Sequence, residues 1–153
     1  MHIEGTGRFV YYAQWPAAVF LPVFFFIGRG NVGAGVGWLG FFGLVYGVIV
    51  IAVLLVPPVL TLFDREVRRA RATRLWYDIA SAVLWLGLLV AGMTVPDAAD
   101  SGPLDTVFMN WFGISAETSA ALFALAAGVT GLAYLASVVT ALRGVAAARR
   151  AQA

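Results

Sequence analysis

One ionisable side chain stands inside an apolar run, where it could take part in transport chemistry. Asp78 lies about one helical turn inside the run that begins near residue 75. An ionisable group at membrane depth is costly, so a proton or cation site is one interpretation. Arg74 stands four residues earlier on the same helical face, so an interfacial ion pair is the other. Gln14, an amide inside the first apolar run, is expected to hydrogen-bond to another helix.

The other polar residues offer few parts for catalysis. The only histidine is His2 and there is no cysteine, so a Ser–His pair, a histidine metal site and paired haem ligands are all missing. Asp97, Asp100 and Asp105 share one connection, where a solvated acidic loop is a simpler interpretation than a divalent-cation site. No phosphate-binding G-x-x-x-x-G-K-[ST] run occurs. We therefore expect no enzyme activity, no cofactor and no metal.

Four apolar runs must position these residues, at about 9–28, 33–63, 75–95 and 118–142. Each exceeds the roughly 18 residues that distinguish a membrane span from a buried core helix. A hydrophobic content of 61% and a charged content of 12% leave too little polar surface for a water-soluble globule. We expect one all-α domain, a polytopic membrane protein with four transmembrane helices in an up-down bundle.

The arginines predict the orientation, because basic residues near spans stay on the cytoplasmic side. The connection 64–74 and the C-terminal tail are rich in arginine, whereas the connection 96–117 has four acidic residues and no basic one. We expect a protein of the cytoplasmic (inner) membrane with both termini in the cytoplasm and 96–117 outside. Arg29 is the one basic residue on the wrong side. All ten basic residues are arginine, which favours a GC-rich bacterial genome, and the net charge of +2 gives no support to nucleic-acid binding.

The connection 64–74 reads DREVRRARATR and is expected to form a short surface helix. Asp64 and Arg68, like Glu66 and Arg69, stand at a spacing that pairs them on one helical face. Surplus arginines attract anionic lipid headgroups at roughly 1 kcal/mol each. A docking site for an acidic partner or nucleotide is the alternative. The expected headgroup contacts are Arg65, Arg68, Arg69 and Arg71.

The second run is too long for one straight span, since about 31 residues would reach about 46 Å against a hydrocarbon core of about 30 Å. Pro57 and Pro58 are expected to start a fresh helical segment. The first half of the run carries glycines at a spacing that lets another helix approach closely. A packing seam is the simpler interpretation, and a pore-lining or substrate groove is the alternative. These glycines are Gly33, Gly37, Gly40, Gly43 and Gly47.

The fourth run carries a second face of small residues. Together with the glycine face, this stripe predicts a tight contact between those two helices or between copies of the chain, and both alternatives stay open. Its members are Ala120, Ala124, Ala127 and Gly131.

Between the third and fourth runs, residues 104–112 predict a short amphipathic helix. Leu104, Val107, Phe108 and Trp111 recur at i, i+3, i+4 and i+7, which places them in one apolar stripe. We expect this helix to lie in the membrane–water interface on the external side of the membrane. Ser115 is expected to cap the fourth span.

The expected function is that of a non-catalytic accessory or scaffold subunit, which packs against itself or a larger membrane complex and contacts membrane lipids. A small oligomeric transporter or channel that uses Asp78, Gln14 and the glycine groove is the alternative, and an interfacial lipid-handling protein is a third class. Transport predicts that Asp78 faces an interior cavity. The scaffold predicts that Asp78 sits at the headgroups beside Arg74.

Overall fold

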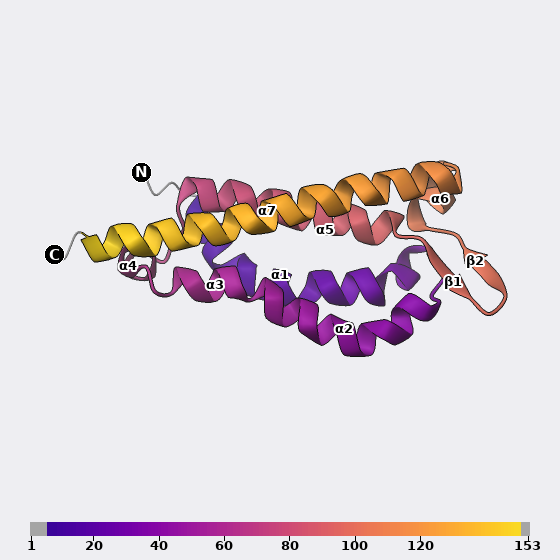
Figure 1. The fold of residues 1–153 in the computed structure, drawn as a ribbon, viewed down its shortest axis with the longest axis horizontal. Helices are drawn as coiled ribbons and strands as arrows, with labels where there is room; N and C mark the ends of the chain where they lie inside the picture. The colour runs from indigo at the N-terminus through magenta and orange to yellow at the C-terminus, as the bar shows by residue number, and fades with distance from the viewer. Residues whose placement is uncertain (1–5, 151–153) are drawn as a thin grey trace.

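The chain folds into long helices joined by short connections, in a computed structural model that describes residues 6–150 (Figure 1). His2 lies outside the described residues. The elements are α1 (Thr6–Phe26), the 3-10 helix η1 (Gly28–Val32), α2 (Trp38–Leu54), α3 (Val56–Thr61), α4 (Arg65–Ala70), α5 (Leu75–Thr94), β1 (Asp97–Ala99), β2 (Gly102–Leu104), α6 (Val107–Phe112) and α7 (Ala116–Arg150). The strands form one antiparallel hairpin that the sequence did not predict.

Four helical segments within residues 6–150 are long and apolar enough to cross a membrane, as the sequence predicted. Three of them are α1, α5 and α7, and the fourth combines α2 with α3. With 35 residues, α7 runs eight positions past the expected end at 142. At 1.5 Å per residue α7 is about 52 Å long, so it exceeds a hydrocarbon core of about 30 Å.

The second apolar run breaks where the prolines predicted a break. Leu55 ends α2 and precedes α3, and Pro57 and Pro58 lie in the first turn of α3. Proline is tolerated there because a first-turn N–H has no partner within the helix. The run also begins later than expected, because residues 33–37 form an irregular connection ahead of α2.

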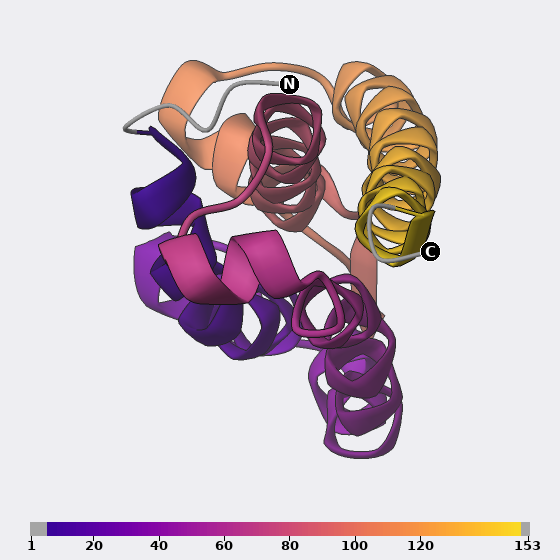
Figure 2. The ribbon, with the colours of Figure 1, turned by 90° about the vertical axis from the view of Figure 1, so that its left-hand side faces the viewer.

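The helices are arranged around α5. It lies beside α7 along most of its length and beside α1 on its other side, as Figure 2 shows from one end. Helix α2 packs on α1, and α3 packs on α7. We call the end with α4 the basic end and the end with the hairpin and α6 the hairpin end (Figure 1).

Small residues form the buried face of α7 and let it approach α5 closely. They recur at intervals of seven, four and three residues, a period near 3.5 that keeps one face toward a neighbouring helix. Gly87 of α5 shows the effect, since an added Cβ there would press on the Thr130 side chain. The buried residues of α7 are Ser119, Ala126, Ala133, Ser137, Ala141, Gly144 and Ala148.

The glycines of the second run serve two contacts. Gly40, Gly43 and Gly47 are buried on α2, and the Phe26 side chain of α1 lies against Gly43 and Gly47. Gly37 precedes the helix and lies against the Ala98 carbonyl group of the hairpin. Gly33 ends η1 at φ 109°, a left-handed conformation that favours glycine.

We predict that Gly43→Leu destabilises the fold by about 1–3 kcal/mol, because the new side chain overlaps Phe26. Gly128→Leu is the matched control, since a Cβ at Gly128 meets nothing within 4 Å. Thermal unfolding of both purified variants in mild detergent, followed by circular dichroism, measures the difference. Equal melting temperatures would contradict the α1–α2 contact.

Candidate functional site

Asp78 is buried at the basic end and does not pair with Arg74. Its side chain is 5% exposed, and its Oδ1 atom accepts a hydrogen bond from the Thr73 hydroxyl group. The Thr73 hydroxyl also lies 3.0 Å from the Gly7 carbonyl oxygen, which ties this corner to α1. Asp78 Oδ2 is buried and has no hydrogen-bond partner. The predicted interfacial ion pair with Arg74 is therefore wrong.

Arg74 turns instead toward α4. Its Nε atom lies 3.0 Å from Asp64 Oδ2 and its Nη2 atom 2.7 Å from Glu66 Oε2. Arg71 explains the geometry, because its left-handed conformation (φ 50°) ends α4 and returns the chain toward the start of that helix. Burial lowers the pKa of Arg74, but the two carboxylates outweigh burial and raise it above its ordinary value.

The short helix expected in 64–74 is present as α4, with different ion pairs from those predicted. Asp64 caps it by accepting the backbone N–H groups of Glu66 and Val67 at 3.0 and 3.4 Å. Because Asp64 and Glu66 are both engaged by Arg74, they do not form the expected pairs along the helix. The expected headgroup residues are all exposed at the basic end: Arg65, Arg68, Arg69 and Arg71.

Gln14 makes the contact between helices that the sequence predicted. It is 2% exposed, and its Oε1 atom accepts a hydrogen bond of 2.8 Å from the Tyr77 hydroxyl group of α5. Its amide nitrogen donates to the Tyr11 carbonyl oxygen at 3.0 Å. The amide is thus bonded on both sides, which suits a structural role between α1 and α5.

The interior near this cluster is nearly filled. Two cavities of about 10 Å³ each lie there, one beside Gln14 and Tyr77 and the other beside Asp64 and Thr73. A volume of about 10–15 Å³ holds roughly one water molecule. Asp78 lines neither cavity. The Asp78 side chain therefore meets neither expectation. It does not face a sizeable cavity, which transport predicts, and it does not lie beside the Arg74 side chain, which the scaffold predicts.

A buried ion pair joins several segments at the hairpin end. The Arg29 guanidinium group of η1 pairs with the Asp97 carboxylate of β1, and its Nη1 atom donates to the Val95 carbonyl oxygen at 3.2 Å. Arg29 is only 1% exposed. Asp97 also accepts the backbone N–H groups of Gly37 and Leu39, at 2.8 and 3.0 Å, and so caps the start of α2 from far along the chain.

This pair bears on two interpretations of the sequence. Arg29, expected as the one basic residue on the wrong side, is the buried partner of Asp97. Asp97 is not part of a solvated acidic loop, whereas Asp100 and Asp105 are exposed. Burial raises the pKa of the Asp97 carboxyl group, but Arg29 and the backbone N–H groups of Gly37, Leu39 and Ala98 outweigh burial and hold the pKa below its usual range. Within residues 6–150, no group of three or more His, Cys, Asp or Glu side chains is placed to hold a metal ion.

The small-residue stripe predicted on the fourth run lies outside the buried face of α7. Ala124, Ala127 and Gly131 are exposed and Ala120 is partly exposed. The predicted tight contact between this stripe and α2 does not form within residues 6–150. Instead, Ala127 and Gly131 line an apolar cleft of about 390 Å³ between α7 and α2, which we call the α2–α7 cleft.

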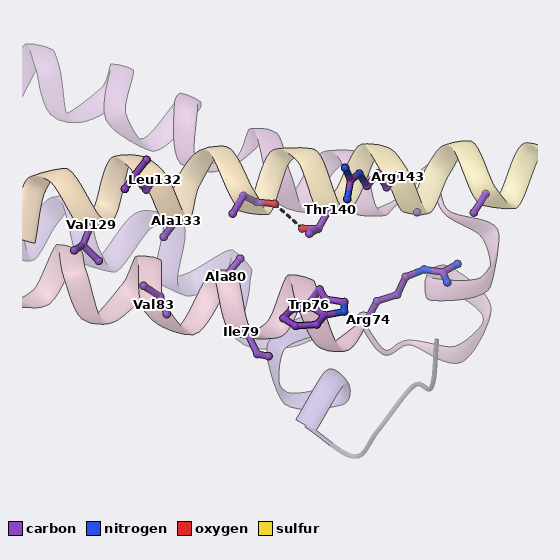
Figure 3. Close-up of a pocket in the computed structure, with 13 residues that line it drawn as sticks. Arg74, Trp76, Ile79, Ala80, Val83, Val129, Leu132, Ala133, Thr140 and Arg143 are labelled. Atoms are coloured by element: carbon purple, nitrogen blue, oxygen red, sulfur yellow. Dashed lines mark hydrogen bonds between the residues drawn. The ribbon is translucent and has the colours of Figure 1, made fainter.

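A second hollow lies between α5 and α7, and we call it the α5–α7 groove (Figure 3). Its volume is about 720 Å³. Aliphatic side chains line most of it, and two arginines and a tryptophan line its basic end. The sequence does not predict this groove, because both of its walls are ordinary apolar helix surface.

The amphipathic helix expected over 104–112 is shorter than predicted. Leu104 belongs to β2, and the Thr106 hydroxyl group caps α6 by accepting the Met109 N–H at 3.2 Å. Val107 is fully buried while Trp111 is 54% exposed, so the structure does not bury the predicted apolar stripe as one face. The Ser115 hydroxyl oxygen accepts the Thr118 N–H at 3.1 Å, which confirms the predicted cap of α7.

No family model, curated protein or solved structure matches this chain. The candidate sites therefore depend on the geometry alone.

We predict that a double-mutant cycle finds coupling between Arg74 and Asp64 and none between Arg74 and Asp78. The variants are Arg74→Gln, Asp64→Asn and Asp78→Asn, singly and in pairs, with the free energy of unfolding as the readout. Contacting pairs couple by about 0.5–3 kcal/mol, while groups that share no interaction add within about 0.5 kcal/mol. Measured coupling between Arg74 and Asp78 would contradict this prediction and support the interfacial ion pair.

We predict that Asp97→Asn destabilises the fold by about 3–5 kcal/mol near pH 7, because it leaves Arg29 buried without a counter-charge. The folded-state pKa of Asp97 is lower than that of the unfolded chain, about 3.9. Its contribution is thus fully present above about pH 5 and is lost as the pH falls through the folded value. The difference in unfolding free energy between wild type and variant should shrink from pH 6 to pH 3.

Asp100→Asn is the control, since Asp100 is exposed in the same connection and is expected to change stability little. A loss of stability equal to that of Asp97→Asn would contradict the special role of the Arg29–Asp97 pair.

Proposed function

We propose that the four apolar segments span the cytoplasmic (inner) membrane of a bacterium as an up-down bundle, with the basic end and both termini in the cytoplasm. The distribution of charge supports this orientation. The exposed arginines of 65–71 and those of 143–150 lie at the basic end. At the hairpin end, the one arginine, Arg29, is buried and paired, so it does not oppose the positive-inside rule.

We propose that the protein is a non-catalytic scaffold or accessory subunit that binds another transmembrane helix, from a second copy or a larger membrane complex. The α2–α7 cleft carries this proposal. Its wall includes Ala127 and Gly131, and an added Cβ at Gly131 would meet nothing within 4 Å. In lipid, helices associate where small residues let backbones approach, so an uncovered wall of this kind favours a partner helix.

The packing of the interior supports a scaffold over a transporter. The cavities beside the buried polar cluster hold about one water molecule each, and Gln14 is engaged by Tyr77 and by the Tyr11 backbone. The glycines Gly43 and Gly47 lie against Phe26, so their face of α2 is occupied by packing on α1. One observation favours transport, the buried Oδ2 atom of Asp78 that has no partner.

We predict that Gly131→Leu releases the partner and that Gly128→Leu does not. Both glycines lie on the exposed surface of α7 with open space around them, and only Gly131 lines the α2–α7 cleft. The matched variants are purified from native membranes in mild detergent, and native electrophoresis and mass spectrometry identify what comes with them. A larger assembly is expected for the wild type and for Gly128→Leu, and its loss for Gly131→Leu.

If the wild type and both variants purify without a partner, the scaffold proposal is wrong. An assembly that survives Gly131→Leu would also contradict it. Because the protein has no cysteine, a single Gly131→Cys variant provides a second measurement, in which cross-linking to the partner is expected in native membranes. Val45→Cys, on the exposed face of α2, is its control.

A further inference from the structure

We propose that the α5–α7 groove binds one anionic phospholipid from the leaflet at the basic end. This inference depends on the proposed membrane insertion and not on the proposed partner helix, because the groove and the α2–α7 cleft share no lining residue.

The groove arises from the close packing of α5 and α7. Its lining includes the small residues Ala80, Ala133 and Ala136, which leave room between larger neighbours. Val83 on α5 and Leu132 on α7 supply the aliphatic walls at the end of the groove farther from Arg74 (Figure 3). A surface of this composition, open to the side, suits hydrocarbon chains.

The distance from Val129, at the end of the groove farthest from α4, to Arg143 matches one leaflet. On α7 the lining runs from Val129 to Ala147, about 27 Å at 1.5 Å per residue, and the part from Val129 to Arg143 is about 21 Å long. A bilayer is about 40–45 Å thick with its headgroup regions, so one leaflet is about 20–22 Å. A lipid with its phosphate beside Arg143 therefore reaches Val129 with its chains, near the middle of the membrane.

Charge at the basic end of the groove selects an anionic headgroup. Arg74 is already engaged by Asp64 and Glu66, but Arg143 is exposed and makes no ion pair within the described part of the chain. Trp76, which is 60% exposed, lies at the same end of the groove as Arg143 (Figure 3). An indole ring favours the headgroup region of a membrane.

The donors at this end are suited to a phosphate. The Thr140 hydroxyl group donates to the Ala136 carbonyl oxygen at 2.8 Å, so it is not free to donate to a ligand (Figure 3). The guanidinium group of Arg143 and the indole N–H of Trp76 remain as donors. A guanidinium group is well matched to phosphate oxygens because its N–H groups form a planar fork.

Native mass spectrometry of the purified chain tests the proposal, with phosphatidylglycerol, phosphatidylcholine and glycerol 3-phosphate as probes. We expect one retained phosphatidylglycerol per chain, weaker retention of phosphatidylcholine, and none of glycerol 3-phosphate, which lacks the chains. Arg143→Gln should lower the preference for phosphatidylglycerol about fivefold. Arg149→Gln, an exposed arginine outside the groove, should leave it unchanged.

Ala136→Phe fills the groove and should reduce retention of both lipids, while Ala121→Phe, on an exposed part of α7 outside the groove, should not. Equal losses for Arg143→Gln and Arg149→Gln would overturn the proposal in favour of general surface charge. Undiminished lipid retention in Ala136→Phe would also overturn the proposal. The same holds if Ala136→Phe disrupts an assembly while lipid retention persists. Gly131→Leu should leave lipid retention intact, so the lipid site and the scaffold can fail separately.

Discussion

The close approach of α5 and α7 determines the rest of the structure. Small side chains on the buried face of α7 allow this approach, and Gly87 of α5 lies directly against Thr130. Since lipid chains are as apolar as the helices themselves, such packing is a main source of helix association in a membrane. The approach leaves a hollow on each flank of α7, the α2–α7 cleft and the α5–α7 groove. Each hollow is therefore a consequence of the seam between the helices.

Polar groups hold the two ends of the bundle in different ways. At the hairpin end, the carboxylate of Asp97 neutralises Arg29 and satisfies N–H groups at the start of α2. At the basic end, Arg74 ties the start of α5 to α4 through Asp64. Both arrangements use a buried carboxylate that pairs with an arginine and also accepts backbone N–H groups at the start of a helix. Between the two ends, packing is supplemented by hydrogen bonds between helices, such as the one that the Tyr134 hydroxyl group donates to the Val53 carbonyl oxygen at 3.1 Å.

Local patterns in the sequence predicted the spans, the break at Pro57 and the cap at Ser115, because each depends on neighbouring residues. The partner of Arg29 could not be found this way, since Asp97 is far along the chain and looked like one of several loop carboxylates. The face of α7 was misjudged because small residues surround the whole helix, so size alone selects no side. Ser119 and Ser137, both fully buried, were the available signal, since polar side chains in a span face other helices.

Asp78 shows why depth in a span does not by itself establish transport. The cost of burying a carboxyl group predicts a function only when something mobile can reach it. Here Thr73 occupies one carboxyl oxygen, and Thr73 also bonds to the backbone of α1 at Gly7. The adjacent cavities admit no more than about one water molecule each. The unpartnered Asp78 oxygen therefore faces neither of these cavities, whereas the two hollows beside α7 are open at the surface.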